Sequence, residues 1–154
     1  MLKKKDLKIL SELRKNAREP LTEMSKKTSI PVSTIYTKLM AYRDSLIKKH
    51  TALLNYEELG YHTIAILFVS CEPEDVDKLK NSLVKSACVN SVFKLDDEYQ
   101  FMAEAIFRHI KDADLFLEQL EQRFRIRQRR VFYIVRELKR ESFLCDLELY
   151  ELSS

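Results

Sequence analysis

The chain has 154 residues, enough for one ordinary domain or two small ones, and its 45% hydrophobic and 33% charged residues are typical of folded proteins. Its single glycine, Gly60, excludes a phosphate-binding Gly-rich loop and a dinucleotide fingerprint, because both need several residues without a Cβ. Three widely spaced cysteines and the amphipathic start MLKKKDLKIL predict a cytoplasmic protein without disulfides or a signal peptide.

Charge divides unevenly along the chain. Residues 1–55 carry 13 Lys and Arg against 5 Asp and Glu, a net charge of +8. Residues 56–154 carry 14 against 19, a net charge of −5. A basic unit is typical of proteins that bind polyanions, because each cation near a phosphate releases a counterion. We therefore expect double-stranded DNA as a partner and no membrane; a solvated basic surface without a partner is the alternative.

The first fifty residues have the periodicity of three helices. Apolar residues recur from Lys4 to Asn16, and Pro20 interrupts this first helix. A second, short helix is expected after Leu21 with Thr22 as its N-cap, followed by a third helix from Val32 to Asp44. The core face of the third helix is predicted to be Ile35, Leu39, Tyr42 and Leu46.

Two short helices joined by a tight turn, with another helix packed behind them, form a helix-turn-helix. Small hydroxyls, a tyrosine and a lysine on the second helix of the pair suit contacts with base edges and phosphates in a major groove. The predicted reading residues are Ser33, Thr34, Tyr36, Thr37 and Lys38. The predicted backbone contacts are Arg18, Lys26, Lys27, Lys48 and Lys49. The alternative is a three-helix bundle whose polar face meets only water.

Several blocks of this region resemble the Lrp/AsnC family of transcription regulators. The blocks are Asp6…Ile9-Leu10…Leu13, Asn16-Ala17-Arg18, Leu21…Glu23-Met24-Ser25, Ser33-Thr34-Ile35…Lys38-Leu39, the segment 46–55 and Leu59-Gly60-Tyr61. The resemblance implies a winged helix-turn-helix over residues 1–50, a strand and hinge over 51–60, and a second domain over 61–140. It also implies a DNA-binding regulator that forms homodimers or octamers and binds a small-molecule effector.

The second domain is predicted to be a ferredoxin-like βαββαβ fold, which makes the whole chain α+β. Continuous apolar or β-branched runs predict strands over 62–69, 89–95, 99–107 and 126–135. Helical spacing predicts helices over 74–86 and 112–124. Beyond these, residues 141–154 form a C-terminal extension, in which Leu147 and Leu149 alternate with acids and predict a strand at a subunit edge.

The turn between the middle strands departs from the pattern of the family. Where relatives have a glycine and effector-binding residues, this chain has Asp96, Asp97, Glu98 and Tyr99. Three consecutive acids would repel a carboxylate, so an amino-acid effector is not expected. An altered effector, a cation and no effector stay open.

A basic segment follows the second of these helices. Arg123, Arg125, Arg127 and Arg129 alternate before Arg130, so the first four are predicted on one side of a strand. They are expected to pair with Asp96–Glu98 or with Asp146, Glu148 and Glu151. An anion site or a second DNA contact is the alternative.

No catalytic, metal or cofactor site is predicted. His50, His62 and His109 are scattered, and none has a cysteine or carboxylate at a metal-ligand spacing. Three other functions share parts of this architecture: a sirohaem-decarboxylase-like enzyme, an architectural DNA-binding protein, and an RNA binder that stacks bases on Tyr99 and Phe101. The positive N-terminal half favours the DNA-binding regulator.

Overall fold

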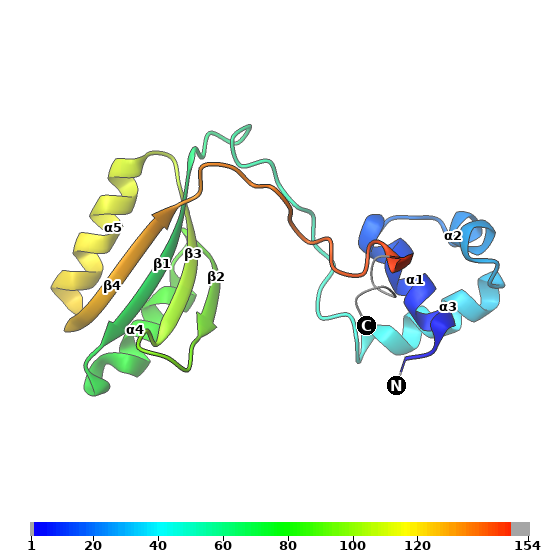
Figure 1. Cartoon of the computed structure of the whole chain (residues 1–154), viewed down its shortest axis with the longest axis horizontal. Coiled ribbons are helices and arrows are strands. Elements are labelled where there is room, and N and C mark those ends of the chain that lie inside the picture. Colours follow the sequence, from blue (N-terminus) through cyan, green and yellow to red (C-terminus); the bar gives the residue numbers. More distant parts are fainter. Residues whose placement is uncertain (1, 149–154) are drawn as a thin grey trace. The chain divides into compact units, whose positions relative to one another are not determined.

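The computed structural model describes residues 2–148, which divide into two compact units. The first unit combines the chain up to Leu53 with the segment from Leu138 onward, and the second comprises Leu54–Glu137. Figure 1 labels the helices and strands of both units. In this part of the chain, no helix combines the length and apolar character that crossing a membrane requires.

The first unit contains three helices, α1 (Lys4–Lys15), α2 (Leu21–Thr28) and α3 (Val32–Arg43). A capping box starts α1, where the backbone N–H of Lys3 donates to Asp6 Oδ2 over 2.8 Å. Helix α2 begins directly after Pro20, whose extended backbone places Leu21 in the first helical position. Thr22 therefore lies inside the first turn, and the expectation that it is the N-cap is wrong.

A tight turn of Ser29, Ile30 and Pro31 joins α2 to α3. Ser29 ends α2 in the left-handed region at φ 57°, which reverses the chain. The Ser25 hydroxyl donates to the carbonyl oxygen of Ile30 over 2.6 Å and holds the turn against α2. The predicted helix-turn-helix is therefore present.

One apolar cluster holds these helices together. Its buried members are Ile9, Met24, Ile30, Ile35 and Tyr42, with Leu39 and Ile47 among the residues packed against them. Leu46, predicted in this core, is 45% exposed, because α3 ends at Arg43 and the following turn directs Ile47 inward instead.

Residues 44–62 form turns and irregular backbone. The strand that the resemblance implies within 51–60 is therefore not formed, since the sheet of the described residues contains only the four strands of the second unit. Gly60 has a φ of 81°, a conformation that favours glycine.

The second unit confirms the predicted βαββαβ order. Its elements are β1 (Thr63–Cys71), the 3-10 turn η1 (Pro73–Asp75), α4 (Val76–Lys85), β2 (Val89–Lys94), β3 (Phe101–Phe107), α5 (Ile110–Arg123) and β4 (Ile126–Tyr133). The strands form one antiparallel sheet in the order β2-β3-β1-β4. Central β1 pairs with β3 and β4, so β2 and β4 are the two edges.

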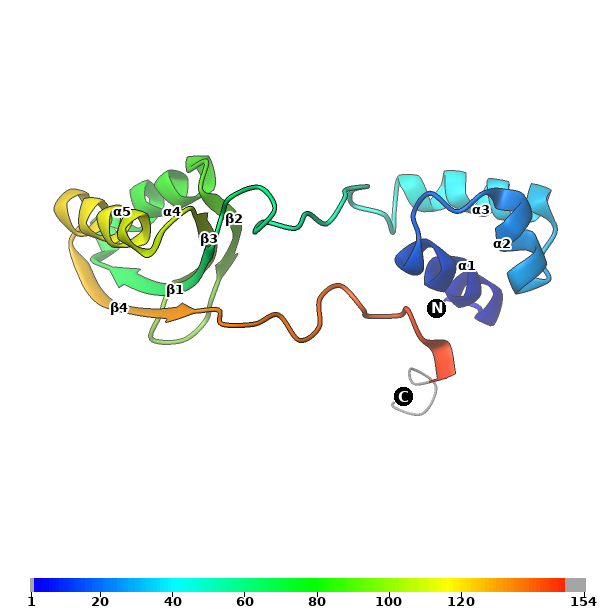
Figure 2. The ribbon, with the colours of Figure 1, turned by 90° about the horizontal axis from the view of Figure 1, so that it is seen from above.

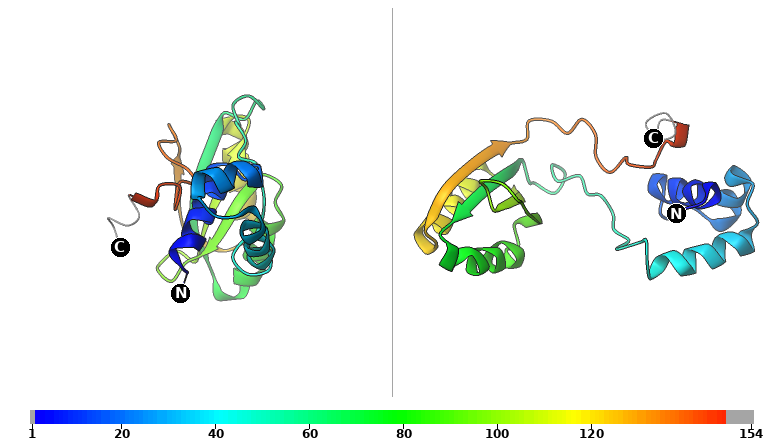
Figure 3. Two further views of the ribbon diagram at one scale, coloured as in Figure 1. Left: turned by 90° about the vertical axis from the view of Figure 1, so that its right-hand side faces the viewer. Right: turned by 60° about the horizontal axis from the view of Figure 1, so that its bottom comes forward.

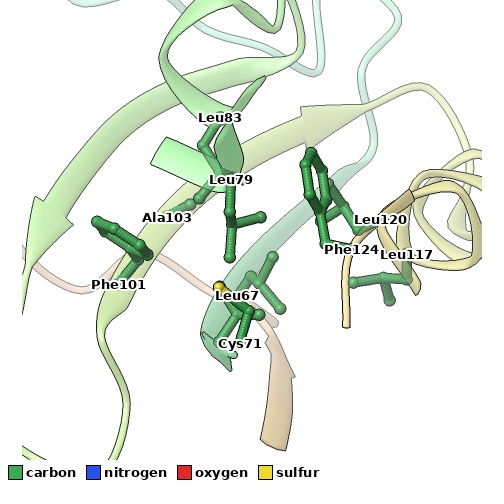
Figure 4. Close-up of a cluster of buried hydrophobic side chains, with 10 residues drawn as sticks. Leu67, Cys71, Leu79, Leu83, Phe101, Ala103, Leu117, Leu120 and Phe124 are labelled. Atoms are coloured by element: carbon green, nitrogen blue, oxygen red, sulfur yellow. The ribbon is translucent and has the colours of Figure 1, made fainter. Parts of the chain in front are cut away.

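Helices α4 and α5 cover the same face of this sheet (Figures 2 and 3). Leu67 of β1 and Phe101 of β3 point to that face and pack with Leu79 and Leu83 of α4 and Leu117 of α5 (Figure 4). The opposite face carries the alternate residues of each strand, and no helix of the second unit lies over it (Figures 2 and 3). Its apolar members include Ile64, Ile66, Phe68, Met102 and Phe132.

The C-terminal segment rejoins the first unit. Residues 141–146 form bends and turns, with helical backbone at Leu147 and Glu148, in place of the expected strand. Glu141 at φ 52° and Leu144 at φ 64° have left-handed backbones, which an extended strand cannot contain. Residues 149–154, the rest of that prediction, lie outside the described residues.

Candidate nucleic-acid interface

Helix α3 is fixed to α1 by a small polar network in the first unit. The Asp6 carboxylate accepts a hydrogen bond from the Tyr42 hydroxyl over 2.5 Å and forms an ion pair with Lys38. These bonds, with that from Lys38 the strongest influence, lower the pKa of Asp6 to about 2. Burial and the neighbouring carboxylate raise the pKa of Tyr42. The network sets the rotation of α3 about its own axis.

This rotation determines which residues of α3 meet solvent. Ser33, Tyr36 and Thr37, three of the predicted reading residues, are exposed, and Tyr36 is 55% exposed. Thr34 is half-buried. Lys38, the fifth of the predicted reading residues, bonds Asp6 on α1 and contributes to the network instead. The helical spacing alone did not indicate this, because Lys38 lies at the border between the two faces.

The predicted backbone-contacting cations are all exposed, but they differ in their partners. Arg18, Lys48 and Lys49 have no acidic partner within residues 2–148. Arg43, at the end of α3, is likewise exposed and without an acidic partner in the described chain.

Two lysines of α2 already have carboxylate partners. Lys26 contacts Glu23 over 2.7 Å, and Lys27 contacts Glu19 over 2.6 Å. The bond between Lys27 and Glu19 raises the pKa of the lysine and lowers that of the glutamate. The Lys26 pair lies at the surface, where exchanging a carboxylate for a phosphate costs little, whereas the Glu19 side chain that holds Lys27 is only 11% exposed.

Sequence reasoning missed the role of the C-terminal segment in this unit. The Arg14 side chain on α1 donates to the carbonyl oxygens of Phe143 (3.1 Å) and Glu141 (2.7 Å), and it also pairs with the Glu141 carboxylate at 2.8 Å. The buried Ser11 hydroxyl donates to the carbonyl oxygen of Cys145 over 3.1 Å. The left-handed residues Glu141 and Leu144 help turn these carbonyls toward α1. The neighbours of Ser11 three and four positions away on the helix are Leu7, Lys8, Arg14 and Lys15, a mostly charged face, so the sequence carried no signal for this contact.

The predicted effector residues lie in an exposed turn of the second unit. Asp96, Asp97 and Glu98 are exposed between β2 and β3, whereas the Tyr99 ring packs at 5.8 Å from that of Phe68. Two surface depressions lie elsewhere, one at the start of β4 and one between α4 and α5. Neither is lined by these four residues.

The basic segment after α5 is paired, but with other acids than expected. Arg125 bonds Asp75 (3.0 Å) and Glu74 (3.2 Å), and Arg127 lies 3.7 Å from Glu72. Two hydrogen bonds from Arg125 to Asp75, the side-chain one first, lower the pKa of Asp75 to about 2.

The predicted alternation of these arginines is also only partly correct. Arg123 ends α5, and β4 begins at Ile126. Opposite Ser70 and Cys71 of β1 the register shifts, so Arg127 falls in an irregularity of the ladder. Arg129 then bonds Glu121 of α5, while Arg130 stacks over Phe132 at 5.1 Å on the open face.

No cluster of His, Cys, Asp and Glu suited to a metal ion is found among the described residues.

Comparisons with known proteins relate this chain to helix-turn-helix transcriptional regulators. A family model described as winged helix-turn-helix DNA-binding matches residues 2–41. An uncharacterised HTH-type transcriptional regulator of Pyrococcus horikoshii is 31% identical over 114 residues, covering 73% of this chain and 77% of that protein. The HTH-type transcriptional regulator FL11 of Pyrococcus furiosus is 29% identical, covering 75% and 77%.

Solved structures share the fold at lower identity. The transcriptional regulator NMB0573 of Neisseria meningitidis, solved in complex with L-Met, has a TM-score of 0.82 at 23% identity, covering 91% of this chain and 94% of that one. LrpC of B. subtilis gives 0.82 at 16% identity (90% and 98%), and AsnC of E. coli gives 0.79 at 15% (91% and 96%).

Proposed function

We propose, because this chain belongs to the Lrp/AsnC family of helix-turn-helix transcriptional regulators, that it binds a specific DNA operator as a homodimer with α3 in the major groove. The observation that carries the proposal is the exposed face of α3, with its hydroxyls at Ser33 and Thr37, in a unit of net positive charge. The relatives are named as regulators, and we infer a cytoplasmic DNA-binding role without catalysis.

The cations divide by the contacts they are proposed to make. Arg18, Lys48 and Lys49, which have no acidic partner among the described residues, are assigned to phosphates. Lys26 joins them after releasing the exposed carboxylate of Glu23, and Lys27 joins them through its exposed ammonium while it stays beside Glu19. Lys38 is removed from the predicted readers, since it holds α3 on Asp6.

The open face of the sheet supports the dimer. Ile64, Ile66, Phe68 and Met102 form an apolar surface that no helix of the second unit covers, and Phe132 is 45% exposed beside them. Large exposed apolar surfaces are unfavourable in water and mark association sites. Two copies joined by a two-fold axis would place two α3 helices on half-sites about one helical turn, or a small multiple, apart. Dimers assembling further, up to an octamer, would multiply such sites.

The proposal also includes a small-molecule effector that modulates DNA binding. The neighbour from N. meningitidis was solved with L-Met, but here the turn of Asp96, Asp97 and Glu98 disfavours a carboxylate ligand. We propose an effector that is not an amino acid. Isothermal titration against amino acids and divalent cations tests this, and tight binding of an amino acid would contradict it.

The main experiment is selection of bound fragments from genomic DNA by the purified full-length protein at two salt concentrations. We expect enriched fragments that share a two-fold symmetric sequence, and binding that falls steeply with salt. Lys48→Ala with Lys49→Ala should weaken specific and random DNA alike and reduce the salt slope by about 2. Salt-sensitive binding without enrichment would instead indicate an architectural protein, and no binding would reject the proposal.

A further inference from the structure

The exposed face of α3 lacks the side chains that read bases through paired hydrogen bonds. Guanine is read this way by Arg or Lys, adenine by Asn or Gln, and cytosine is contacted by Asp or Glu. Helix α3 contains no Asn, Gln, Asp or Glu. Its two cations are Lys38, which is paired with Asp6, and Arg43, its last residue, at the end of a reading helix that contacts the DNA backbone.

Apolar side chains occupy that face instead. Val32 is 39% exposed, Tyr36 55% and Met40 42%, and their four-residue spacing places them in one stripe along the helix. At 1.5 Å per residue the stripe is about 12 Å long. This length corresponds to roughly three or four base pairs at 3.4 Å each. The only apolar group that bases present in the major groove is the 5-methyl group of thymine.

The hydroxyls beside the stripe favour the same base pair. The Thr37 hydroxyl donates its hydrogen to the carbonyl oxygen of Ser33 over 3.0 Å, which leaves its oxygen as an acceptor. An acceptor next to apolar groups matches an A·T pair, whose adenine presents an amino donor and whose thymine presents the methyl group.

We propose that this protein reads its operator through thymine methyl groups, with Val32, Tyr36 and Met40 as the specificity-determining residues. The inference rests on the proposed function, because it requires α3 to lie in the major groove. Each half-site contains a run of A·T pairs that faces the stripe of Val32, Tyr36 and Met40. Ser33 and Thr37 each add a single hydrogen bond to a base of this run.

Replacement of thymine by uracil tests the proposal, since uracil keeps every hydrogen bond and removes only the methyl group. On the selected operator, uracil at a contacted position lowers affinity by about fourfold for each fully buried methyl group. In the variants Val32→Ala and Met40→Ala the difference between thymine and uracil operators shrinks at the matching positions. The matched control, Lys26→Ala, weakens both operators equally and keeps the difference.

Thermal unfolding of both alanine variants should match the wild type, because both side chains are exposed. The results of the uracil experiment distinguish failure of the methyl readout from failure of the proposed DNA-binding function. An operator whose affinity is unchanged by uracil at every position would overturn the methyl readout and leave the regulator in place. Retained discrimination in both variants would overturn the assignment of these residues. Failure to enrich any operator would overturn the proposed function itself.

Discussion

Asp6 is the residue on which the geometry of the proposed reading helix depends most. One nearly buried carboxylate closes the capping box of α1 and accepts bonds from Lys38 and Tyr42, two residues of α3. A charged acceptor shared by three donors is stronger than any neutral replacement, because charge-assisted hydrogen bonds are roughly twice as strong as neutral ones. Asp6, a residue of α1, therefore determines which face of α3 is exposed to solvent.

Asp6→Asn should lower the stability of the first unit by roughly 2 kcal/mol, since the amide leaves the ammonium of Lys38 without its counter-charge. Denaturant-dependent hydrogen exchange of α1 and α3 measures this loss. Glu23→Gln is the matched control, because it removes an exposed pair with Lys26 and should cost less than about 0.5 kcal/mol. Equal losses in the two variants would show that the network adds nothing.

The lowered pKa of Asp6 also predicts how stability depends on pH. The folded state holds this pKa at about 2, below the ordinary 3.8, so the charged form stabilises the fold at every pH above about 4. That contribution is lost as the pH falls from 4 toward 2. The difference between wild type and Asp6→Asn should therefore be largest above pH 4 and shrink below it.

Hydrogen exchange must be followed in α1 and α3, because Asp75 of the second unit titrates in the same range. A difference that stays constant down to pH 2 would contradict the assignment to Asp6.

At the scale of elements, the C-terminal segment packs with α1, α2 and α3 in the same compact unit. It gives α1 contacts to backbone carbonyls of residues more than a hundred positions away, through Ser11 and Arg14. Residues 134–137 connect β4 to this segment, so two stretches of chain join the helical unit to the second unit, one after α3 and one before Leu138.

Arg14→Ala should release the C-terminal segment from α1. The change removes three hydrogen bonds, and we expect a loss of about 1 kcal/mol in the first unit, together with faster tryptic cleavage after Lys139 and Arg140. Lys15→Ala is the control, because among the described residues Lys15 pairs with Glu12 of its own helix alone. Cleavage at the same rate in both variants would mean that the contacts do not hold the segment.

At the scale of the whole molecule, the proposed dimer places a large apolar face at an interface. Phe132→Arg should prevent sheet-to-sheet packing and halve the mass measured by light scattering, because a buried unpaired charge is costly. Operator affinity should fall with it, as only one half-site can then be held. Val84→Arg provides the control, since Val84 is 65% exposed on α4 and lies outside this face. A Phe132→Arg protein of wild-type mass would exclude the open face as the interface.

Much of the fold was predictable because the relevant signals are local. Helical spacing predicted α1, α3 and α5 to within two residues at either end, and runs of β-branched residues predicted the four strands. The ion pairs of the arginines at β4 were predictable in kind, since the second half has excess acid. Their partners were not, because Arg123 and Arg125 precede β4 and a ladder irregularity opposite Ser70 and Cys71 displaces Arg127 from the regular alternation.

The sequence by itself determined the helix-turn-helix, the βαββαβ order and the basic character of the first unit, because periodicity, turn residues and charge are properties of short segments. Only the tertiary structure decided that Lys38 binds Asp6 and that the C-terminal segment lies on α1. Both contacts join residues far apart in the chain. A side chain at the border of a helix face is exposed or paired depending on which residues the packing of the helices brings beside it. The apolar stripe of α3 is exposed for that reason, and the choice of bases proposed for it depends on the same packing.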